Sequence, residues 1–188
     1  MKRIEYIFLL LISLSSCIDY TPKPRGYFRI ELPEPQYTLL PDNKLPYAFE
    51  LSNGITVELP PVTEPEGWIN LFYPQLQAKI YCSYLPITPS SYKEVESENR
   101  SLVLRQARES DIIENEYVDA ENKVYATLFE IEGNAASPVQ FFITDSTTHF
   151  FRGALYFETK LNTDSLMPVI NYVTYDIIHL IETFYWKN

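Results

Sequence analysis

Eight short extended segments lie between residues 47 and 157, and they constrain the fold of the chain more than any other feature. Aromatic, aliphatic and β-branched residues are frequent in these segments, as they are in strands. The segments predicted as strands are 47–51, 55–59, 68–73, 77–85, 112–118, 124–131, 139–144 and 149–157. Because most of the connections are hairpin-like, we expect an antiparallel sheet.

The first pair of strands is predicted to form a hairpin around Ser52-Asn53-Gly54. Asn-Gly adopts the positive φ angles that a two-residue hairpin turn requires. A second hairpin is predicted from 112–118 and 124–131, and a third from 139–144 and 149–157. These local pairings account for most of the expected sheet.

Two other segments show helical periodicity. Residues 90–109 are predicted as a helix, with Ser91 and Glu94 at the spacing of a capping box. A second helix follows, capped by Asp164 or Ser165, with Pro168 in its first turn. Its apolar face comprises Leu166, Val169, Ile170, Val173, Ile177, Leu180, Ile181 and Phe184. The polar residues expected largely away from that face are Asn171, Thr174, Asp176 and Glu182.

The order of elements is therefore about four strands, a helix, about four strands and a final helix. Two amphipathic helices can cover such a sheet, which defines the α+β class. We predict an antiparallel β-sheet flanked by two main helices, and this order resembles the Mog1/PsbP-like architecture. Residues 44–188 are expected to form a single α+β domain.

Residues 1–16 have the pattern of a bacterial lipoprotein signal peptide. Lys2 and Arg3 precede the apolar run Ile7–Ile12, which is too short to span a membrane. Leu14-Ser15-Ser16-Cys17 matches a lipobox, in which small residues precede the cysteine that receives the lipid. We predict that lipid on Cys17 anchors the protein to a membrane from outside the cytoplasm. The alternative is an ordinary signal peptide in which this cysteine is incidental.

Residues 17–43 are predicted as the lipidated cysteine followed by a proline-rich tether or strap. Nine of the 14 prolines lie between Pro22 and Pro65. Proline at this density blocks helix and favours an extended, semi-rigid chain. The part from Arg25 to Leu32 is more apolar, and we expect it to pack on the domain as an edge strand or strap.

Charge and composition exclude several classes of protein. The chain has 15 Lys+Arg against 25 Asp+Glu, a net charge of −10, which argues against a nucleic-acid partner. It has only five glycines and no Gly-rich loop of the kind that holds nucleotide phosphates. With Cys17 lipidated, Cys82 has no disulfide partner, and we interpret it as a small core residue. No cofactor is predicted.

The densest polar cluster runs from Thr144 to His149, and Arg152 follows it. Because it contains Asp145, Ser146 and His149, a small hydrolase using His149 is one alternative. No G-x-S-x-G motif accompanies these residues, and short polar residues are typical of hairpin turns. We therefore predict no catalytic residue and interpret the cluster as a turn or docking surface.

The predicted interaction surface joins this cluster to the loop and strand before it. Its residues are Asn134, Ser137, Gln140, Asp145, His149 and Arg152. The other histidine, His179, lies near Asp176 and Glu182 in sequence, but no cysteine or second histidine stands nearby. We predict no metal site and expect His179 on a solvated helix face.

Aromatic residues make up 15% of the chain, more than a domain of this size is expected to bury completely. Exposed aromatic side chains suit protein contacts and sugar-binding faces. One alternative function is therefore a periplasmic glycan- or small-ligand-binding lipoprotein.

Several long strings carry a resemblance that covers essentially the whole mature chain. They are Tyr20–Ile30, Gly133–Ser146 and His149–Phe157, followed by Asn162, Asp164-Ser165 and Pro168–Ile170. These strings resemble the GldD family of gliding-motility lipoproteins. The resemblance implies a lipoprotein required for gliding and associated with type IX protein secretion, without enzymatic activity.

The same resemblance implies acyl chains such as palmitate on Cys17 and an outer-membrane location facing the periplasm. It implies partners among other gliding or type IX secretion lipoproteins or channel components. The expected function is to support the assembly or stability of that machinery.

Overall fold

The computed structural model describes residues 32, 34–41, 44–61, 64–108, 110–133, 135–158 and 163–187. The predicted signal peptide, Cys17, Asn134 and nearly all of the expected strap at 25–32 lie outside the described residues. The strands are β1 (Tyr37–Leu39), β2 (Tyr47–Ala48), β3 (Glu50–Ser52), β4 (Thr56–Glu58), β5 (Ile69–Tyr73), β6 (Ala78–Pro86), β7 (Ile112–Asp119), β8 (Val124–Ile131), β9 (Val139–Thr144), β10 (His149–Phe157) and β11 (Tyr185–Trp186). The helices are α2 (Tyr92–Ala107) and α3 (Thr163–Glu182).

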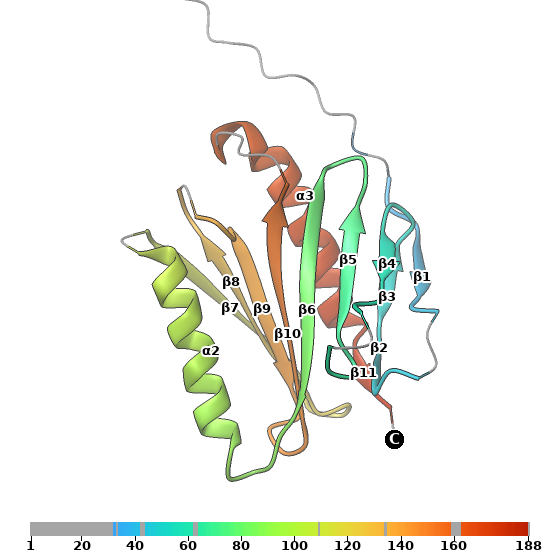
Figure 1. Cartoon of the computed structure of the whole chain (residues 1–188), viewed down its shortest axis with the longest axis vertical. Helices are drawn as coiled ribbons and strands as arrows, with labels where there is room; N and C mark the ends of the chain where they lie inside the picture. Colours follow the sequence, from blue (N-terminus) through green and yellow to red (C-terminus); the bar gives the residue numbers. More distant parts are fainter. Residues whose placement is uncertain are drawn as a thin grey trace, which may run out of the picture.

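Seven of these strands form one antiparallel sheet in the order β4-β5-β6-β10-β9-β8-β7 (Figure 1). The longest pairing joins β6 to β10, with Phe157 opposite Ala78 at one end and His149 opposite Pro86 at the other. The hairpins β7–β8 and β9–β10 form where the sequence predicts them. The α+β class and the antiparallel sheet are therefore confirmed.

The hairpin predicted around Asn53-Gly54 is wrong. β3, before the turn, pairs with β1, whereas β4, after the turn, pairs with β5. A turn does form, because the Ile55 amide donates to the Ser52 carbonyl at 3.1 Å. Neither Asn53 nor Gly54 has the positive φ that matches hairpin twist, so the two strands diverge into different sheets.

Helix α3 packs against one face of the sheet and lies behind it in Figure 1. Its predicted apolar face is confirmed, because every one of those residues is buried. They join a core that includes Tyr47, Phe49 and Phe151, all with 0% exposure. The expectation for Thr174 and Asp176 is wrong, since both are buried, and Tyr37 of β1 bonds to Asp176.

Helix α2 covers the opposite face of the sheet. Its residues Val103 and Ala107 pack in a second core with Phe129, Phe142 and Phe150. Because side chains alternate along a strand, β8, β9 and β10 supply residues to both cores. The result is three layers, with the sheet between the two helices (Figure 1).

The two helix starts differ from the predicted caps. Ser91 makes no capping hydrogen bond to α2, because its hydroxyl bonds to Thr88 instead. Helix α3 begins at Thr163, so Asp164 and Ser165 lie within it and Pro168 lies beyond its first turn. Ser91 therefore stands at the predicted N-cap position of α2 but without the hydrogen bonds of a capping box, and the predicted cap of α3 is wrong.

Two short sheets extend the core beside β4 and β5. Strand β1 pairs with β3, and β11, after α3, pairs with β2. Strand β1 lies within the segment predicted as tether or strap, and Tyr37, Thr38 and Leu39 are in register with β3. This part of the segment therefore packs on the domain.

Neither helix in the described part of the chain combines the length and apolar character that crossing a membrane requires.

Candidate binding site

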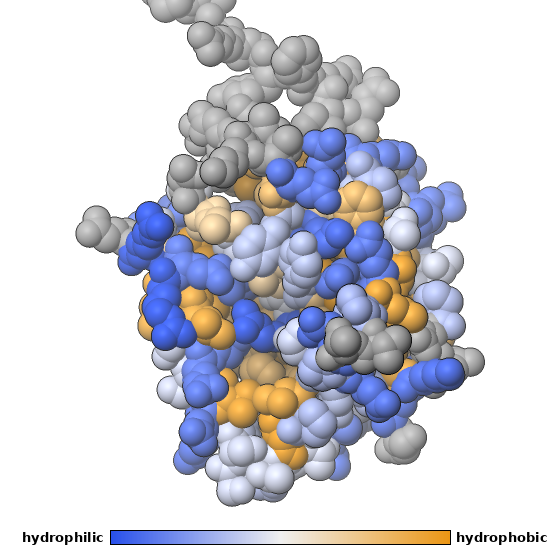
Figure 2. All heavy atoms as spheres, in the orientation of Figure 1, coloured by the Kyte–Doolittle hydropathy of each residue, from blue (hydrophilic) through white to orange (hydrophobic). Residues whose placement is uncertain are grey.

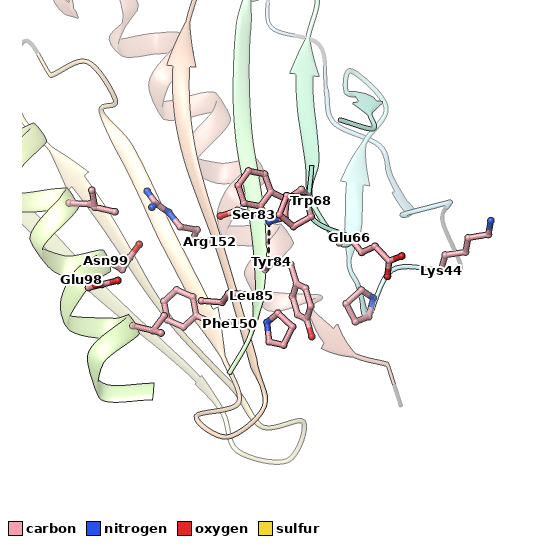
Figure 3. Close-up of a pocket in the computed structure, with 16 residues that line it drawn as sticks. Lys44, Glu66, Trp68, Ser83, Tyr84, Leu85, Glu98, Asn99, Phe150 and Arg152 are labelled. Atoms are coloured by element: carbon pink, nitrogen blue, oxygen red, sulfur yellow. Dashed lines mark hydrogen bonds between the residues drawn. The ribbon is translucent and has the colours of Figure 1, made fainter. Parts of the chain in front are cut away.

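A cavity of about 590 Å³ opens between α2 and the strands β6 and β10 (Figure 3). The loop before β5 contributes Trp68, and β6 contributes Ser83 and Leu85. Strand β10 contributes Phe150 and Arg152, and α2 contributes apolar residues and Asn99. This volume falls in the range of small-molecule binding sites, which is roughly 300–1,000 Å³.

The cavity lies on the face of the molecule seen in Figure 2. Apolar side chains gather there between the hydrophilic residues of α2, on the left, and the strands at the centre. Val95 and Leu102 of α2 and Phe150 of β10 supply apolar lining. An apolar wall with few polar groups is typical of sites that hold a ligand.

Lys44 and Arg152 are the basic residues that line the cavity, and Arg152 is the one that lies on the sheet. Figure 3 shows it extending from β10 toward α2, where Asn99 lies. The described residues place no carboxylate within ion-pair distance of its guanidinium. Burial lowers the pKa of Arg152, because loss of water disfavours the charged form. Its positive charge is therefore available to an anionic ligand.

Hydrogen bonds fix the wall of the cavity that lies away from α2 and is formed by the loop before β5 and by β6. The Trp68 indole donates to the Tyr84 carbonyl at 3.0 Å, and the Tyr47 hydroxyl donates to the Gly67 carbonyl at 2.6 Å. Gly67 has φ +86°, and a Cβ there would lie 2.8 Å from Tyr84 Cδ1. Only glycine fits such a position. The wall is therefore formed before any ligand arrives.

Arg152 is the member of the predicted interaction surface that lines this cavity. Ser137 and Gln140 are buried, at 0% and 2% exposure, so neither can touch a partner in this conformation. The Gln140 amide donates to Gln106 of α2 at 3.0 Å and ties β9 to that helix. The structure thus does not bring the predicted residues into one surface.

Asp145 organises the β9–β10 turn. Its carboxylate accepts backbone hydrogen bonds from Thr147, Thr148 and His149, at 2.8–2.9 Å, and the hydroxyls of both threonines. Burial alone would raise the pKa of Asp145, but these hydrogen bonds outweigh it and hold the pKa well below the usual range. The local turn therefore depends on an ionised carboxylate.

We predict that Asp145→Asn lowers the free energy of unfolding at pH 7 by about 1 kcal/mol, because hydrogen bonds to a charged acceptor are lost. The wild-type contribution is present above the ordinary pKa of about 4 and is lost as the pH falls below it. Chemical denaturation from pH 7 to pH 3 should show a flatter acid limb in the variant. Asp119→Asn, at an exposed turn with fewer donors, should change both quantities less. Identical acid limbs for wild type and Asp145→Asn would contradict this role.

His149 lies on the face of β10 opposite Arg152. Its Nδ1 is 2.7 Å from the Tyr84 hydroxyl, and its ring stacks on Trp186 at 4.8 Å. These contacts join β10 to the C-terminal strand β11. His149 is thus engaged in packing, while Asp145 is engaged in the turn.

The expectation of a solvated face around His179 is wrong. Its Nε2 is 2.8 Å from Glu50 Oε2, and its ring stacks on Tyr37 at 3.6 Å. The Tyr37 hydroxyl also donates to Asp176 at 2.8 Å. Burial raises the pKa of Asp176 despite this hydrogen bond. The cluster fastens β1 and β3 to α3.

Within the described residues, no group of three or more histidine, cysteine, aspartate or glutamate side chains is placed to hold a metal ion. Cys82 is buried in the main core, where loss of water raises the pKa of its thiol. This environment fits a structural cysteine.

The fold and the cavity together define a class, an α+β domain with an antiparallel sheet between two helices and a binding site under one of them. A similar fold occurs in the solution structure of cyanobacterial PsbP (CyanoP) from Synechocystis sp. PCC 6803, with a TM-score of 0.51 and 11% identity. The match covers 88% of this chain and 100% of that chain. The predicted PsbP-like fold is therefore confirmed.

A search of curated proteins gives no match. The family model described as gliding motility lipoprotein GldD matches residues 18–186. Because this match covers nearly the whole chain, the protein belongs to the GldD family. Membership places it among the lipid-anchored proteins of the cell envelope that take part in gliding motility.

Proposed function

We propose that this protein is a non-enzymatic lipoprotein that supports the assembly or stability of the gliding and type IX secretion machinery. The match to the GldD family over residues 18–186 carries the proposal. The description of the family as lipoproteins, together with the lipobox Leu14-Ser15-Ser16-Cys17, supports lipidation at that cysteine and anchoring of the folded domain by acyl chains. We further propose that the lipid lies in the outer membrane and that the domain faces the periplasm.

The surface offers places where other envelope proteins can dock. Large apolar side chains stand exposed on different sides of the molecule, with Tyr81 at 51%, Leu104 at 62%, Val118 at 70% and Tyr175 at 71% exposure. Tyr81 lies on β6, on the sheet face that α2 leaves partly open, whereas Tyr175 lies on the outer side of α3. Apolar aromatic side chains of this kind are common at protein contacts.

Site-specific photocrosslinking in the native membranes tests this proposal. A photoreactive amino acid is placed in turn at Tyr81, Leu104, Val118 and Tyr175, and the crosslinked proteins are identified by mass spectrometry. We expect other gliding lipoproteins or secretion-channel components at one of these positions and not at the others, because a specific interface covers one side of a domain. An absence of such components at all four positions would count against an assembly role.

A second candidate function, binding of a small ligand by an envelope lipoprotein, is favoured by the cavity beside Arg152. It does not exclude the first, because a ligand can occupy the cavity while another surface contacts a partner.

A further inference from the structure

The cavity between α2 and the sheet contains an arginine, Arg152, that forms no ion pair with any described carboxylate. Arg152 shares the sheet face with Ser83, its cross-strand neighbour on β6. Arg100, on the same helix that closes the cavity, shows the usual arrangement, because it pairs with Glu96 at 3.2 Å and with Glu114 at 2.6 Å. The described residues offer Arg152 no equivalent carboxylate. Burying a guanidinium without an anion is unfavourable, so the site favours a ligand that supplies one.

The chemistry of the wall narrows the class of ligand. Trp68, Leu102 and Phe150 give the cavity an apolar body, and Arg152 gives it a planar donor that matches a carboxylate with two parallel hydrogen bonds. Lys44, Glu66 and Glu98 also border the cavity, so its lining carries two negative and two positive side chains, a balance that does not favour a ligand with several negative groups. A ligand with one anionic end and an apolar remainder fits both conditions.

We propose that this cavity binds an organic monocarboxylate, with its carboxylate on Arg152 and its apolar part between Trp68, Leu102 and Phe150. The hydrogen bonds of Trp68 to Tyr84 and of Tyr47 to Gly67 hold the wall in shape, so little ordering is required on binding. Such a carboxylate can be the free end of a peptide or the head of a fatty acid, because both present the same group on an apolar body. This inference does not depend on the role in gliding, since it concerns binding by the isolated protein.

Isothermal titration calorimetry on the full lipidated protein in zwitterionic nanodiscs tests the inference. The probes are N-acetyl-leucyl-phenylalanine, the same dipeptide as its C-terminal amide, decanoate, and benzyl phosphate as an anion of another class. We expect the acid to bind roughly tenfold or more tightly than the amide, because the amide lacks the charge that Arg152 recognises. Tighter binding of the peptide acid identifies a polypeptide end as the preferred source, and tighter binding of decanoate identifies a fatty acid.

Three variants separate the role of Arg152 from general effects. Arg152→Gln should weaken binding of the acid roughly tenfold and leave the amide almost unchanged, and Arg152→Lys should fall between. Arg105→Gln, an exposed arginine in the last turn of α2 and outside the cavity, is the matched control and should bind like wild type. Arg152→Gln should keep its thermal stability, since it removes an unbalanced and partly buried charge.

Equal affinity of wild type for the acid and the amide would overturn the inference, whether or not the variants fold. So would the failure of both carboxylates to bind up to their solubility limits, or tighter binding of benzyl phosphate than of either one. Normal gliding and secretion in cells that carry Arg152→Gln would leave the binding result intact, because the titration measures the site itself.

Discussion

Replacing Gly153 by Val is expected to lower the free energy of unfolding by about 3 kcal/mol, at the upper end of the usual cost of overpacking. Gly153 lies in the middle of β10, and a Cβ built there would lie 2.4 Å from two ring carbons of Phe141 and 3.2 Å from Ile80 Cγ2. Phe141 is only 1% exposed and packs on Phe151, with ring centroids 6.1 Å apart. Because the ring is buried among other core side chains, it can move only by displacing them, so the added side chain must distort the packing of the central strands.

Thermal unfolding of the purified protein measures this effect. For a domain of this size, such a loss corresponds to a fall in the midpoint of roughly 6–12 °C. Gly54→Ala is the matched control, because the nearest atom to its Cβ would be Ser52 Oγ at 3.9 Å. We expect that variant to stay within about 0.5 kcal/mol of wild type. A Gly153→Val protein as stable as the control would show that the core around β10 accommodates a side chain that these distances exclude.

The close approach at Gly153 marks a limit of sequence reasoning. The segment 149–157 is rich in aromatic and aliphatic residues, as buried strands are, and its hairpin with β9 follows from a short turn, so both were predictable. The place of this strand at the centre of the sheet depends on its pairing with β6, whose residues lie far away in the chain. Periodicity gives the face of a strand, but it does not give the neighbours of that strand.

The first predicted hairpin was wrong for a similar reason. Asn53-Gly54 is a strong local turn signal, and the chain does turn there. The strands on either side nevertheless join different sheets, because β1 and β5 offer them longer-range partners. Tertiary pairing thus overrides a local hairpin preference.

The candidate site, too, was predictable only in part from local sequence. The polar cluster led to the prediction of Arg152 as a candidate interaction residue, but its position in a cavity did not follow from the sequence. The alternation of β5 places Trp68 on the face opposite Ile69 and Leu71, so its exposure to that side could have been inferred. The cavity itself forms only because α2 covers part of the sheet and leaves the strands near β6 open, which no local pattern states.

The buried positions of α3 illustrate a further limit. The apolar face of this helix was predicted correctly, yet Asp176 and His179 were expected to meet water. Both contact Tyr37, which belongs to a segment predicted as a tether. From its type alone, a polar residue on a helix is expected to be exposed. Asp176 can be buried because a strand distant in sequence packs on the helix and donates a hydrogen bond from a hydroxyl group.

Replacing Cys17 by Ala is expected to abolish lipidation and anchoring, and with them gliding. Each buried methylene of an acyl chain contributes about 0.8 kcal/mol, so loss of all chains removes a strong attachment to the membrane. The net charge of −10 offers no attraction to anionic lipid headgroups in compensation. The protein should lose metabolic labelling with palmitate and be released or mislocalised, and colonies should not spread.

Cys82→Ala is the matched control for this experiment, because it removes the other cysteine of the chain from a buried position. Loss of a small buried side-chain atom costs about 1 kcal/mol, which a stable domain tolerates, so this variant should remain labelled, anchored and motile. Labelling that persists in Cys17→Ala and disappears in Cys82→Ala would contradict the prediction, because it would show that Cys82 carries the lipid. Full spreading by an unlabelled Cys17→Ala protein would separate gliding from the anchor, since the domain would then act without attachment to the membrane.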